Sequence, residues 1–586
     1  MFERPMSVQS QDKYFPRWEI FPAYAARIGC AVFTADFLTM FLMNVARLDT
    51  AWLPYLFFGL FGAAAFAIFR AQRIPSTHPA YLSITQQRRL TLLVLFVVFL
   101  LAAARLPYLL EGRLHHLVGA VVYDDTWHFQ EINSLVHSVR YPAQCSLVPN
   151  RYFSLYYAPW MMIAAIYLAV PLHGFTIKAA FAIGCAIYQF LLCMTLLYVG
   201  ISRSGSRKQL YWAIYLIACW AGVESFFSAM YYLRRNLVWL RASETPIHLP
   251  PLLTGILWAP HHAATAVALI LCWHMWDRAQ EKHWSLVLQC SVLLAFAFYG
   301  SVFVFLGALP FAAYYSLRSA RANYKAILGV TCLTAALIWP LLWIYLGKTH
   351  DVRFVFPFIK GIDDLFPYLA SPEFTALHPG IASAFGVFHG IAAAFFVFLV
   401  FIFLNFLLHA IALMFHGKNL SLDSIALASI AIAFIISIYF IGFPEGDNYA
   451  SRGYLIPILV LGWICAQLLP EIRPRPWIVL GLLLGSFGLL HEEFATFRHA
   501  VYVARTPVNP TYGAAILAMN QDRDTSSTIS SSVLSKAFQD DPDLIYSVEK
   551  FVDGGKSHLV VADRQLECLG PRGPWRWQQR PMPPGK

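Results

Sequence analysis

Two adjacent carboxylates, Asp124 and Asp125, begin the polar segment Tyr-Asp-Asp-Thr-Trp-His-Phe-Gln-Glu at residues 123–131. If this segment is helical, Asp124, His128 and Glu131 share one face, because positions i, i+4 and i+7 line one side of a helix. Adjacent carboxylates can hold a divalent metal such as Mg²⁺ or Mn²⁺, or one of them can act as a base with a raised pKa. The alternative is a solvated loop helix with an aspartate cap at its N-terminus.

A second chemically capable group is the pair His261 and His262, which follows Trp258-Ala259-Pro260 at the start of a long apolar run. Neighbouring imidazoles can bind a metal or an anion, or can shuttle protons. The alternative is a pair of interfacial histidines that hydrogen-bond to nearby backbone. The sequence leaves both interpretations open.

Three arginines, Arg234, Arg235 and Arg241, lie shortly before this histidine pair. Their segment is expected on the outer side of a membrane, which runs against the tendency of basic residues to stay in the cytoplasm. Recognition of an anion would explain them, because a guanidinium binds phosphate through two parallel hydrogen bonds. An error in the assigned topology is the alternative.

A third polar segment, residues 444–454, contains Asp447, Asn448 and Arg452 just before a late apolar run. Arg452 is expected at the outer boundary of that run, where the phosphate of a lipid-linked molecule would lie. The alternative is an interfacial arginine whose charged end reaches the lipid headgroups.

The apolar runs around these segments determine the class of protein. The chain has 586 residues, 58% of them hydrophobic and 13% charged, whereas soluble domains carry about 25% charged residues. Runs near 20 residues match a hydrocarbon core roughly 30 Å thick, and the backbone inside lipid must form helices to satisfy its hydrogen bonds. We expect an all-α polytopic membrane protein with about 13–15 transmembrane helices. Examples of the runs are Phe21–Val45, Trp52–Phe69, Leu90–Ala104 and Ile425–Phe443.

The net charge of +11 is explained by short basic loops on the cytoplasmic side, so we expect no nucleic-acid partner. No zinc-type cysteine spacing occurs. Cys145 and Cys568 are the two cysteines expected outside the spans, and the sequence does not decide whether they pair.

The alternation of basic loops gives the topology. Residues 1–20 are expected in the cytoplasm, 21–491 form the membrane domain with 106–150 as its first large outer loop, and 492–586 form an outer tail or small domain. Residues 151–200 contain two apolar blocks, although the alternation requires an odd number of crossings there. Either one block is re-entrant or interfacial, or the segment crosses three times. The basic cytoplasmic connections include Arg278/Lys282, Arg318/Arg321/Lys325, Lys418 and Arg473/Arg475.

Together these features resemble the GT-C superfamily of membrane glycosyltransferases, whose members carry an acidic motif in the first large outer loop. Asp124-Asp125 is similar to that motif, and Asp447-Asn448-Tyr449-Ala450-Ser451-Arg452 looks like an Asn/Asp-aromatic-x-x-Arg element of some bacterial members. The acidic motif here follows the third span, where the family usually carries it after the first. Two additional N-terminal helices would explain this difference, and so would a different family.

The resemblance implies transfer of a sugar from a polyprenyl-phosphate-linked donor to a lipid, glycan or protein acceptor. It implies a multi-pass protein of a bacterial inner membrane with its active site facing outward. Asp124 or Asp125 would act as the base, and Arg452, with Arg234 and Arg235, would bind the donor phosphate. The further site candidates are His128, His261, His262, Asp447 and Asn448.

The competing function is transport, flipping or polymerisation of lipid-linked glycans. A transporter of this kind should show inverted repeats with broken helices in matching halves. The sequence shows no such internal symmetry, and polymerases usually carry their key residues in late outer loops.

The topology predicts that residue 530 lies outside the cytoplasm. A Ser530→Cys variant should react with a membrane-impermeant thiol reagent in intact cells, with the parent chain as the background. The basic segment Arg70–Arg89 is expected in the cytoplasm, so a Ser76→Cys variant there should react only after lysis. Labelling of residue 530 only after lysis would overturn the topology and the outer placement of Arg452.

Overall fold

The computed structural model describes most of the expected membrane domain and a few residues beyond it. The described residues are 21–71, 82–114, 121, 123–143, 157–170, 172, 175–220, 252–279, 283–346, 358–359, 391–442, 452–471, parts of 479–505, 548–553 and 556–561. The site candidates Arg234, Arg235, Asp447 and Asn448 lie outside these residues, as do Cys145 and Cys568.

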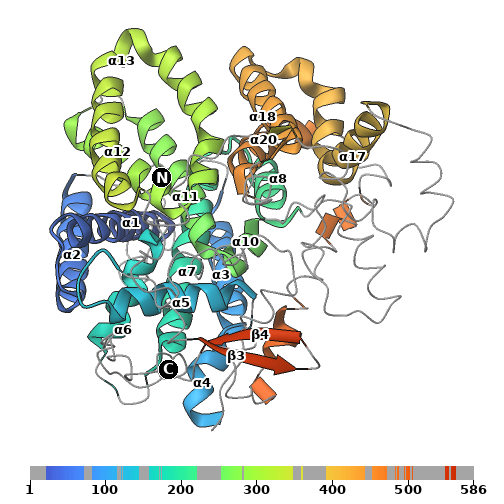
Figure 1. Cartoon of the computed structure of the whole chain (residues 1–586). Coiled ribbons are helices and arrows are strands. Elements are labelled where there is room, and N and C mark those ends of the chain that lie inside the picture. Colours follow the sequence, from blue (N-terminus) through green and yellow to red (C-terminus); the bar gives the residue numbers. More distant parts are fainter. Residues whose placement is uncertain are drawn as a thin grey trace, which may run out of the picture.

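The described chain is mainly helical (Figure 1). Its α-helices are α1 (Phe21–Val45), α2 (Leu53–Ala71), α3 (Ile84–Ala103), α4 (Leu106–Leu114), α5 (Tyr123–His137), α6 (Met161–Ala169), α7 (Ile177–Arg203), α8 (Arg207–Ile214), α10 (Leu252–Trp258), α11 (Pro260–Arg278), α12 (Trp284–Gly300), α13 (Val302–Tyr345), α17 (Ile391–His416), α18 (Leu422–Phe440) and α20 (Leu455–Leu468). Short helical turns are η1 (Thr50–Trp52), η2 (Ala158–Trp160), the π-helical η3 (Tyr215–Cys219), η5 (Gly417–Asn419) and η6 (Leu469–Glu471).

Two small antiparallel strand pairs depart from the expected all-α fold. β1 (Phe358–Ile359) pairs with β2 (Ile441–Gly442), which ends the apolar run of α18 earlier than expected. β3 (Val548–Asp553) pairs with β4 (Lys556–Val561), with Asp553 opposite Lys556. The intervening dipeptide is Gly554-Gly555, which is favoured in two-residue hairpin loops because both positions need positive φ. A search by helical periodicity alone does not detect such short pairs.

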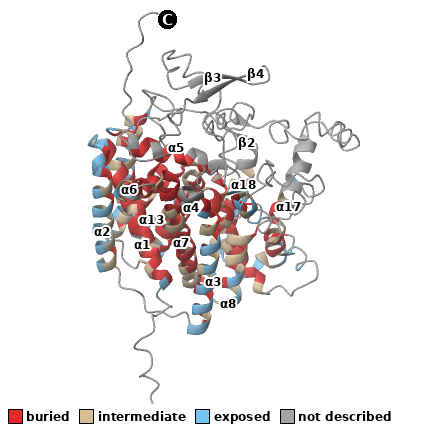
Figure 2. Cartoon of the chain, turned by 90° about the horizontal axis from the view of Figure 1, so that it is seen from below, coloured by how far each residue is buried: buried red, intermediate tan, exposed pale blue. Residues whose placement is uncertain are grey.

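The membrane class of the protein is supported by both helix length and exposed surface. Five described helical segments are long and apolar enough to cross a bilayer: Phe21–Val45, Thr50–Arg70, Ile84–Ala103, Ile177–Arg203 and Val302–Tyr345. The outer faces of α2 and α3 are exposed (Figure 2) and carry large apolar side chains such as Tyr55, Phe66, Phe96 and Phe99. An apolar surface this extensive is typical of contact with lipid rather than water.

The ambiguous segment 151–200 contains one long helix and one short helix. α6 has nine residues and is about 14 Å long at a rise of about 1.5 Å per residue, roughly half of a hydrocarbon core. α7 has 27 residues and is long enough to cross. The lengths favour the re-entrant alternative, in which α6 enters the bundle without crossing it.

The 44 residues of α13 fold back on themselves. Asn323 has non-helical backbone angles (φ −131°, ψ 20°), and two hydroxyls of α12 reach carbonyls of the second half of α13. Ser291 Oγ lies 3.3 Å from the Val330 oxygen, and Tyr299 donates to Ile338. In a straight helix Ile338 would lie roughly 54 Å from Val302, at about 1.5 Å per residue, far from Tyr299. The chain therefore reverses at Asn323, in agreement with the predicted basic connection at Arg318/Arg321/Lys325.

Two buried polar residues of α1 fix the turn η2. Asp36 accepts a hydrogen bond from the Met162 amide at 2.8 Å and another from the Tyr188 hydroxyl. Asn44 Oδ1 accepts from the hydroxyls of Tyr157 at 2.9 Å and Tyr345 at 2.7 Å. Since a buried polar group is costly unless it is hydrogen-bonded, these contacts favour a single position for the chain on both sides of η2.

One end of the bundle gathers segments that are far apart in sequence. The Tyr141 amide donates to the Leu48 carbonyl at 3.0 Å, which joins the α1–η1 connection to the chain after α5. His499 Nδ1 lies 2.9 Å from the Val121 carbonyl oxygen. The predicted first outer loop and the start of the predicted outer tail are therefore in contact, and the side of the membrane on which they lie stays a prediction.

The hydrogen bonds from Tyr157 and Tyr345 to Asn44, called here the Asn44 clamp, can be tested through Tyr345. Tyr345→Phe removes one of the two hydroxyl donors to Asn44, so we expect the free energy of unfolding to fall by about 0.5–1.5 kcal/mol. The measurement is the thermal unfolding of the purified protein. Tyr324→Phe, at an exposed tyrosine of the same helix α13, is the matched control and should unfold like the parent. Equal unfolding of the two variants would contradict the clamp.

Candidate functional site

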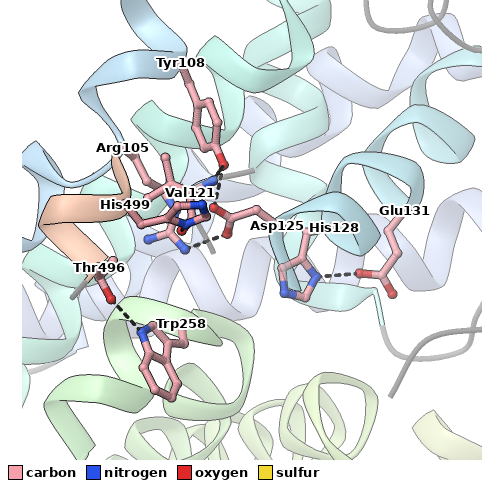
Figure 3. Close-up of polar contacts among 9 residues, drawn as sticks. All are labelled: Arg105, Tyr108, Val121, Asp125, His128, Glu131, Trp258, Thr496 and His499. Atoms are coloured by element: carbon pink, nitrogen blue, oxygen red, sulfur yellow. Dashed lines mark hydrogen bonds and ion pairs between the residues drawn. The ribbon is translucent and has the colours of Figure 1, made fainter. Parts of the chain in front are cut away.

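The predicted helix at the acidic segment is present as α5, and it points three ionisable side chains into the protein (Figure 3). Asp125, His128 and Glu131 are all buried. The solvated loop helix considered as an alternative is therefore wrong for these three residues. Asp124 lies in the first turn of α5, and its side chain is outside the described part of the structure.

Asp125 forms a buried ion pair with Arg105, which lies in the turn between α3 and α4. Arg105 Nη2 lies 2.8 Å from Asp125 Oδ1, and the two side chains are 1% and 0% exposed. Tyr108 donates its hydroxyl proton to Asp125 Oδ2 at 2.8 Å, and the Val121 amide donates to the Tyr108 oxygen at 2.5 Å. Burial alone would lower the pKa of Arg105, but the charge of Asp125 outweighs burial and holds that pKa above its usual value. Both carboxylate oxygens of Asp125 are thus engaged by donors.

Arg105 has further hydrogen-bonding capacity that no described group uses. Its Nε and Nη1 atoms are buried without a hydrogen-bond partner, and its guanidinium carbon lies 5.2 Å from the centre of the Phe181 ring. A buried donor without a partner costs about 1–3 kcal/mol. Such donors are retained where a ligand satisfies them, and an anion is the ligand that suits a guanidinium.

His128 is oriented by Glu131, one helical turn further along α5. His128 Nδ1 lies 3.1 Å from Glu131 Oε2, while His128 Nε2 is buried without a hydrogen-bond partner. The pKa of His128 lies well below its usual value, first because burial disfavours the imidazolium and then because Arg105 and Arg452 are positive. Burial thus favours the neutral imidazole, and in the tautomer that donates Nδ1–H to Glu131 the lone pair of Nε2 faces no described partner.

The histidine pair lies at the start of α11, next to His128. Pro260 is the first residue of α11, a position that tolerates proline because the first amide has no helical partner. The rings of His261 and His262 are 3.7 Å apart, and the His261 ring is 4.8 Å from that of His128. Neither ring nitrogen of His262 has a hydrogen-bond partner among the described residues.

Trp160 contributes a third kind of ring to the site, next to the imidazoles of His128 and His261. Its ring centre lies 4.5 Å from that of His128 and 5.2 Å from that of His261. Trp160 is the last residue of η2, the turn that Asp36 and Asn44 hold from α1. The polar clamps in the membrane domain thereby determine where this indole meets the two imidazoles.

Arg452, just before α20, lies within electrostatic range of all three histidines. The neighbouring residue Gly453 packs against Gly307 of α13, where a side chain on residue 307 would have its Cβ 2.2 Å from the Gly453 carbonyl oxygen. Only glycine permits this approach. The structure therefore brings together residues from the acidic segment, the histidine pair and the late arginine segment.

Sequence reasoning did not select Arg105, Tyr108 or Trp160, and it did not assign Glu131 as the partner of His128. The signal for Arg105 was present, since it is a charged residue at the expected outer end of an apolar run, where ionisable groups are functional candidates. Trp160 carried no signal, because aromatic residues are common throughout the chain.

The expected divalent metal stays a prediction, because the side chain of Asp124 lies outside the described residues. They include no group of three or more histidine, cysteine, aspartate or glutamate side chains suited to hold a metal ion. A metal needs carboxylate oxygens that accept it, but Asp125 already accepts from Arg105 and Tyr108. We therefore derive no step through a metal.

No protein-family model, no curated protein and no solved structure matches the chain. The chemistry of the site is consequently inferred from its own residues. Two arginines provide positive charge, neutral imidazoles provide acceptors and donors, and burial strengthens each interaction. The arrangement suits binding of a phosphate and removal of a proton from a hydroxyl.

The neutral state of His128 predicts how stability depends on pH. Below about pH 6.5 the unfolded chain binds a proton at residue 128 that the folded chain does not bind. Stability contributed by this site is therefore present above about pH 6.5 and is lost as the pH falls, by at most about 1.4 kcal/mol per pH unit. His128→Gln should show a smaller decrease in melting temperature between pH 7 and pH 5 than the parent. Identical pH dependence of the two proteins would show that the pKa of His128 is the same in the folded and the unfolded chain.

Proposed function

We propose that this protein is a membrane glycosyltransferase of the GT-C type, which transfers a sugar from a polyprenyl-phosphate-linked donor to a hydroxyl-bearing acceptor. The acceptor is a lipid, a glycan or a protein. Within this proposal the chain has about 13–15 transmembrane helices, lies in a bacterial inner membrane and carries its active site on the outer face.

One observation carries the proposal. Residues near positions 105, 125–131, 160, 261–262 and 452 meet in a buried site at one end of an apolar helical bundle. Buried ionisable residues at the boundary of a membrane domain are costly, and they mark the binding of substrates or ions. A lipid-linked sugar phosphate enters such a site from the bilayer and places its anionic group at the boundary.

The donor phosphate is assigned to Arg452 and Arg105. Arg105 presents two buried nitrogen atoms, Nε and Nη1, without described partners, and Arg452 lies within electrostatic range of the same histidines. Positive groups held in place before reaction stabilise the charge that develops on a departing phosphate. Arg234 and Arg235 remain predicted further contacts, and Asp447 and Asn448 remain candidates from the same outer side.

The acceptor proton is assigned to His128 Nε2. The acceptor oxygen attacks the anomeric carbon, the bond from that carbon to the phosphate oxygen breaks, and its electron pair leaves with the phosphate. The proton of the acceptor hydroxyl passes to His128, whose imidazolium is stabilised by Glu131 through Nδ1–H, as a carboxylate orients and supports a catalytic histidine. The negative donor phosphate raises the pKa of His128 when it binds, which prepares the imidazole to accept the proton.

The acidic pair has divided roles in this proposal. Asp125 acts as a positioning residue, because its carboxylate is already paired with Arg105 and a nearby cation makes a carboxylate a weaker base. Asp124 remains the second candidate for the base, as the sequence predicts. His261 and His262 form the wall between the base and the phosphate.

The experiment compares purified Asp124→Asn, Asp125→Asn and His128→Gln variants in sugar transfer from a polyprenyl-phosphate-linked donor, with and without EDTA. General-base catalysis is typically worth about 10²–10⁴-fold, so loss of the base should lower turnover by that factor with little change in donor affinity. We expect this loss of turnover for His128→Gln. For Asp125→Asn we expect a lower melting temperature in addition to a loss of turnover, because the ion pair with Arg105 is broken. Arg452→Lys should weaken donor binding, because the bidentate contact is lost while the charge remains.

Other outcomes reassign the roles. A large loss of turnover in Asp124→Asn alone would make Asp124 the base, and an EDTA-sensitive reaction restored by Mg²⁺ or Mn²⁺ would assign a metal to the acidic pair. If all three variants transfer sugar at the parent rate, this site is not the active site and the glycosyltransferase proposal is wrong. Movement of a lipid-linked glycan across proteoliposomes without sugar transfer would favour the transporter.

A further inference from the structure

A cavity of about 880 Å³ lies inside the bundle, and its lining extends from Arg203 and Asp277 to Ile456, which lies one helical turn after Arg452. Its walls come from α3, α7, α11, α12, α13 and α20 and are mostly apolar, with Leu93, Leu269, Ile338 and Ile464 among the lining residues. The volume falls within the roughly 300–1,000 Å³ of typical ligand sites. Walls of this kind suit hydrocarbon and give water few polar partners.

One end of the cavity is charged. Arg203, at the end of α7, forms an ion pair with Asp277 of α11 at 2.7 Å, and Arg318 of α13 forms another with Asp423 of α18. The Arg203 guanidinium lies 3.9 Å from the centre of the Trp273 ring. Its Nη2 atom is buried without a hydrogen-bond partner, so one donor of this arginine remains available at the end of the apolar space.

This charged end is far from the histidine site. His261 is the second residue of the same helix that ends with Asp277 and Arg278, and the 16 steps from His261 to Asp277 correspond to about 24 Å at about 1.5 Å per residue. In Figure 2, α5 lies towards one end of the bundle, and α8, which follows Arg203, lies at the other. The separation approaches the thickness of a hydrocarbon core, about 30 Å.

An apolar space with a charged end suits an amphiphile. Among the described residues near this end the basic ones exceed the acidic ones, since Arg207 and Lys208 begin α8 shortly after Arg203, and Arg278 donates to the Ser202 carbonyl beside it. Basic pockets between membrane helices recognise anionic headgroups, and guanidinium groups bind phosphate particularly well. The cavity is only partly enclosed, and Leu93 belongs to α3, whose outer face is exposed.

We propose that this cavity binds one acidic phospholipid of the bilayer, with its acyl chains in the apolar space and its phosphate at Arg203. The phosphate satisfies the available Nη2 donor of Arg203 while the Asp277 pair holds the guanidinium in place. This lipid differs from the sugar donor, whose phosphate is assigned to the opposite end of the bundle. The inference does not depend on the proposed enzymatic function.

The test uses phosphatidylglycerol that carries a diazirine on one acyl chain, in phosphatidylcholine nanodiscs containing the full-length protein. After irradiation, mass spectrometry should locate labels on cavity-lining peptides of α7, α11 and α13, and unlabelled phosphatidylglycerol should compete. Ala312→Phe places a ring in the cavity and should abolish the labelling. Ala313→Phe, whose residue does not line the cavity, is the matched control and should keep it.

Ala335→Leu against Ala336→Leu provides a second matched pair if Ala312→Phe does not fold. Arg203→Gln should raise the concentration of phosphatidylglycerol needed for competition by about tenfold, whereas the exposed Arg321→Gln should not. Equal labelling of the filled variants and their controls would overturn the proposed site. Phosphatidylcholine or polyprenyl phosphate that competes as well as phosphatidylglycerol would overturn the assignment to an acidic phospholipid.

Discussion

The buried ion pair between Arg105 and Asp125 is the interaction on which the histidine site depends. Two charges removed from water are costly unless they are close and further hydrogen-bonded, and here Tyr108 and the Val121 amide supply the additional bonds. The pair joins the end of α3 to the start of α5. By fixing the first turn of α5, it fixes the direction in which His128 and Glu131 enter the protein.

The cost of removing polar groups from water also applies to the other buried polar side chains of the bundle. Each of them is therefore either hydrogen-bonded within the fold or a candidate for contact with a ligand. Asp36 and Asn44 are fully engaged and hold the backbone around η2. Arg105, His128 and His262 instead retain buried donors or acceptors without described partners. Engaged polar groups of this kind stabilise a fold, whereas groups kept available at a cost indicate where a ligand supplies the missing partner.

The sequence predicts the helical membrane class well, because apolar runs near 20 residues have few alternative structures. The predicted run Phe21–Val45 coincides with α1, and the basic segment around Arg318 and Lys325 marks the reversal of α13 at Asn323. The helix at Asp125 was predictable from its spacing, but its burial was not, because the partner Arg105 lies 20 residues earlier. Contacts such as those of Trp160 depend on how distant segments pack, which one sequence does not encode in any local pattern. The pairing of β1 with β2 was missed for the same reason.

The contact between Gly307 and Gly453 has a mechanical consequence. The first half of α13 carries Gly307 on the backbone beside Arg452 and also supplies Ala308 and Ala312 to the wall of the large cavity. Because no side chain lies between the two backbones, no rotamer change can accommodate a displacement of one backbone relative to the other. A shift of this half-helix by a fraction of an ångström would therefore also move the peptide that positions the Arg452 guanidinium. A ligand that changes the width of the cavity would in this way change the position of Arg452.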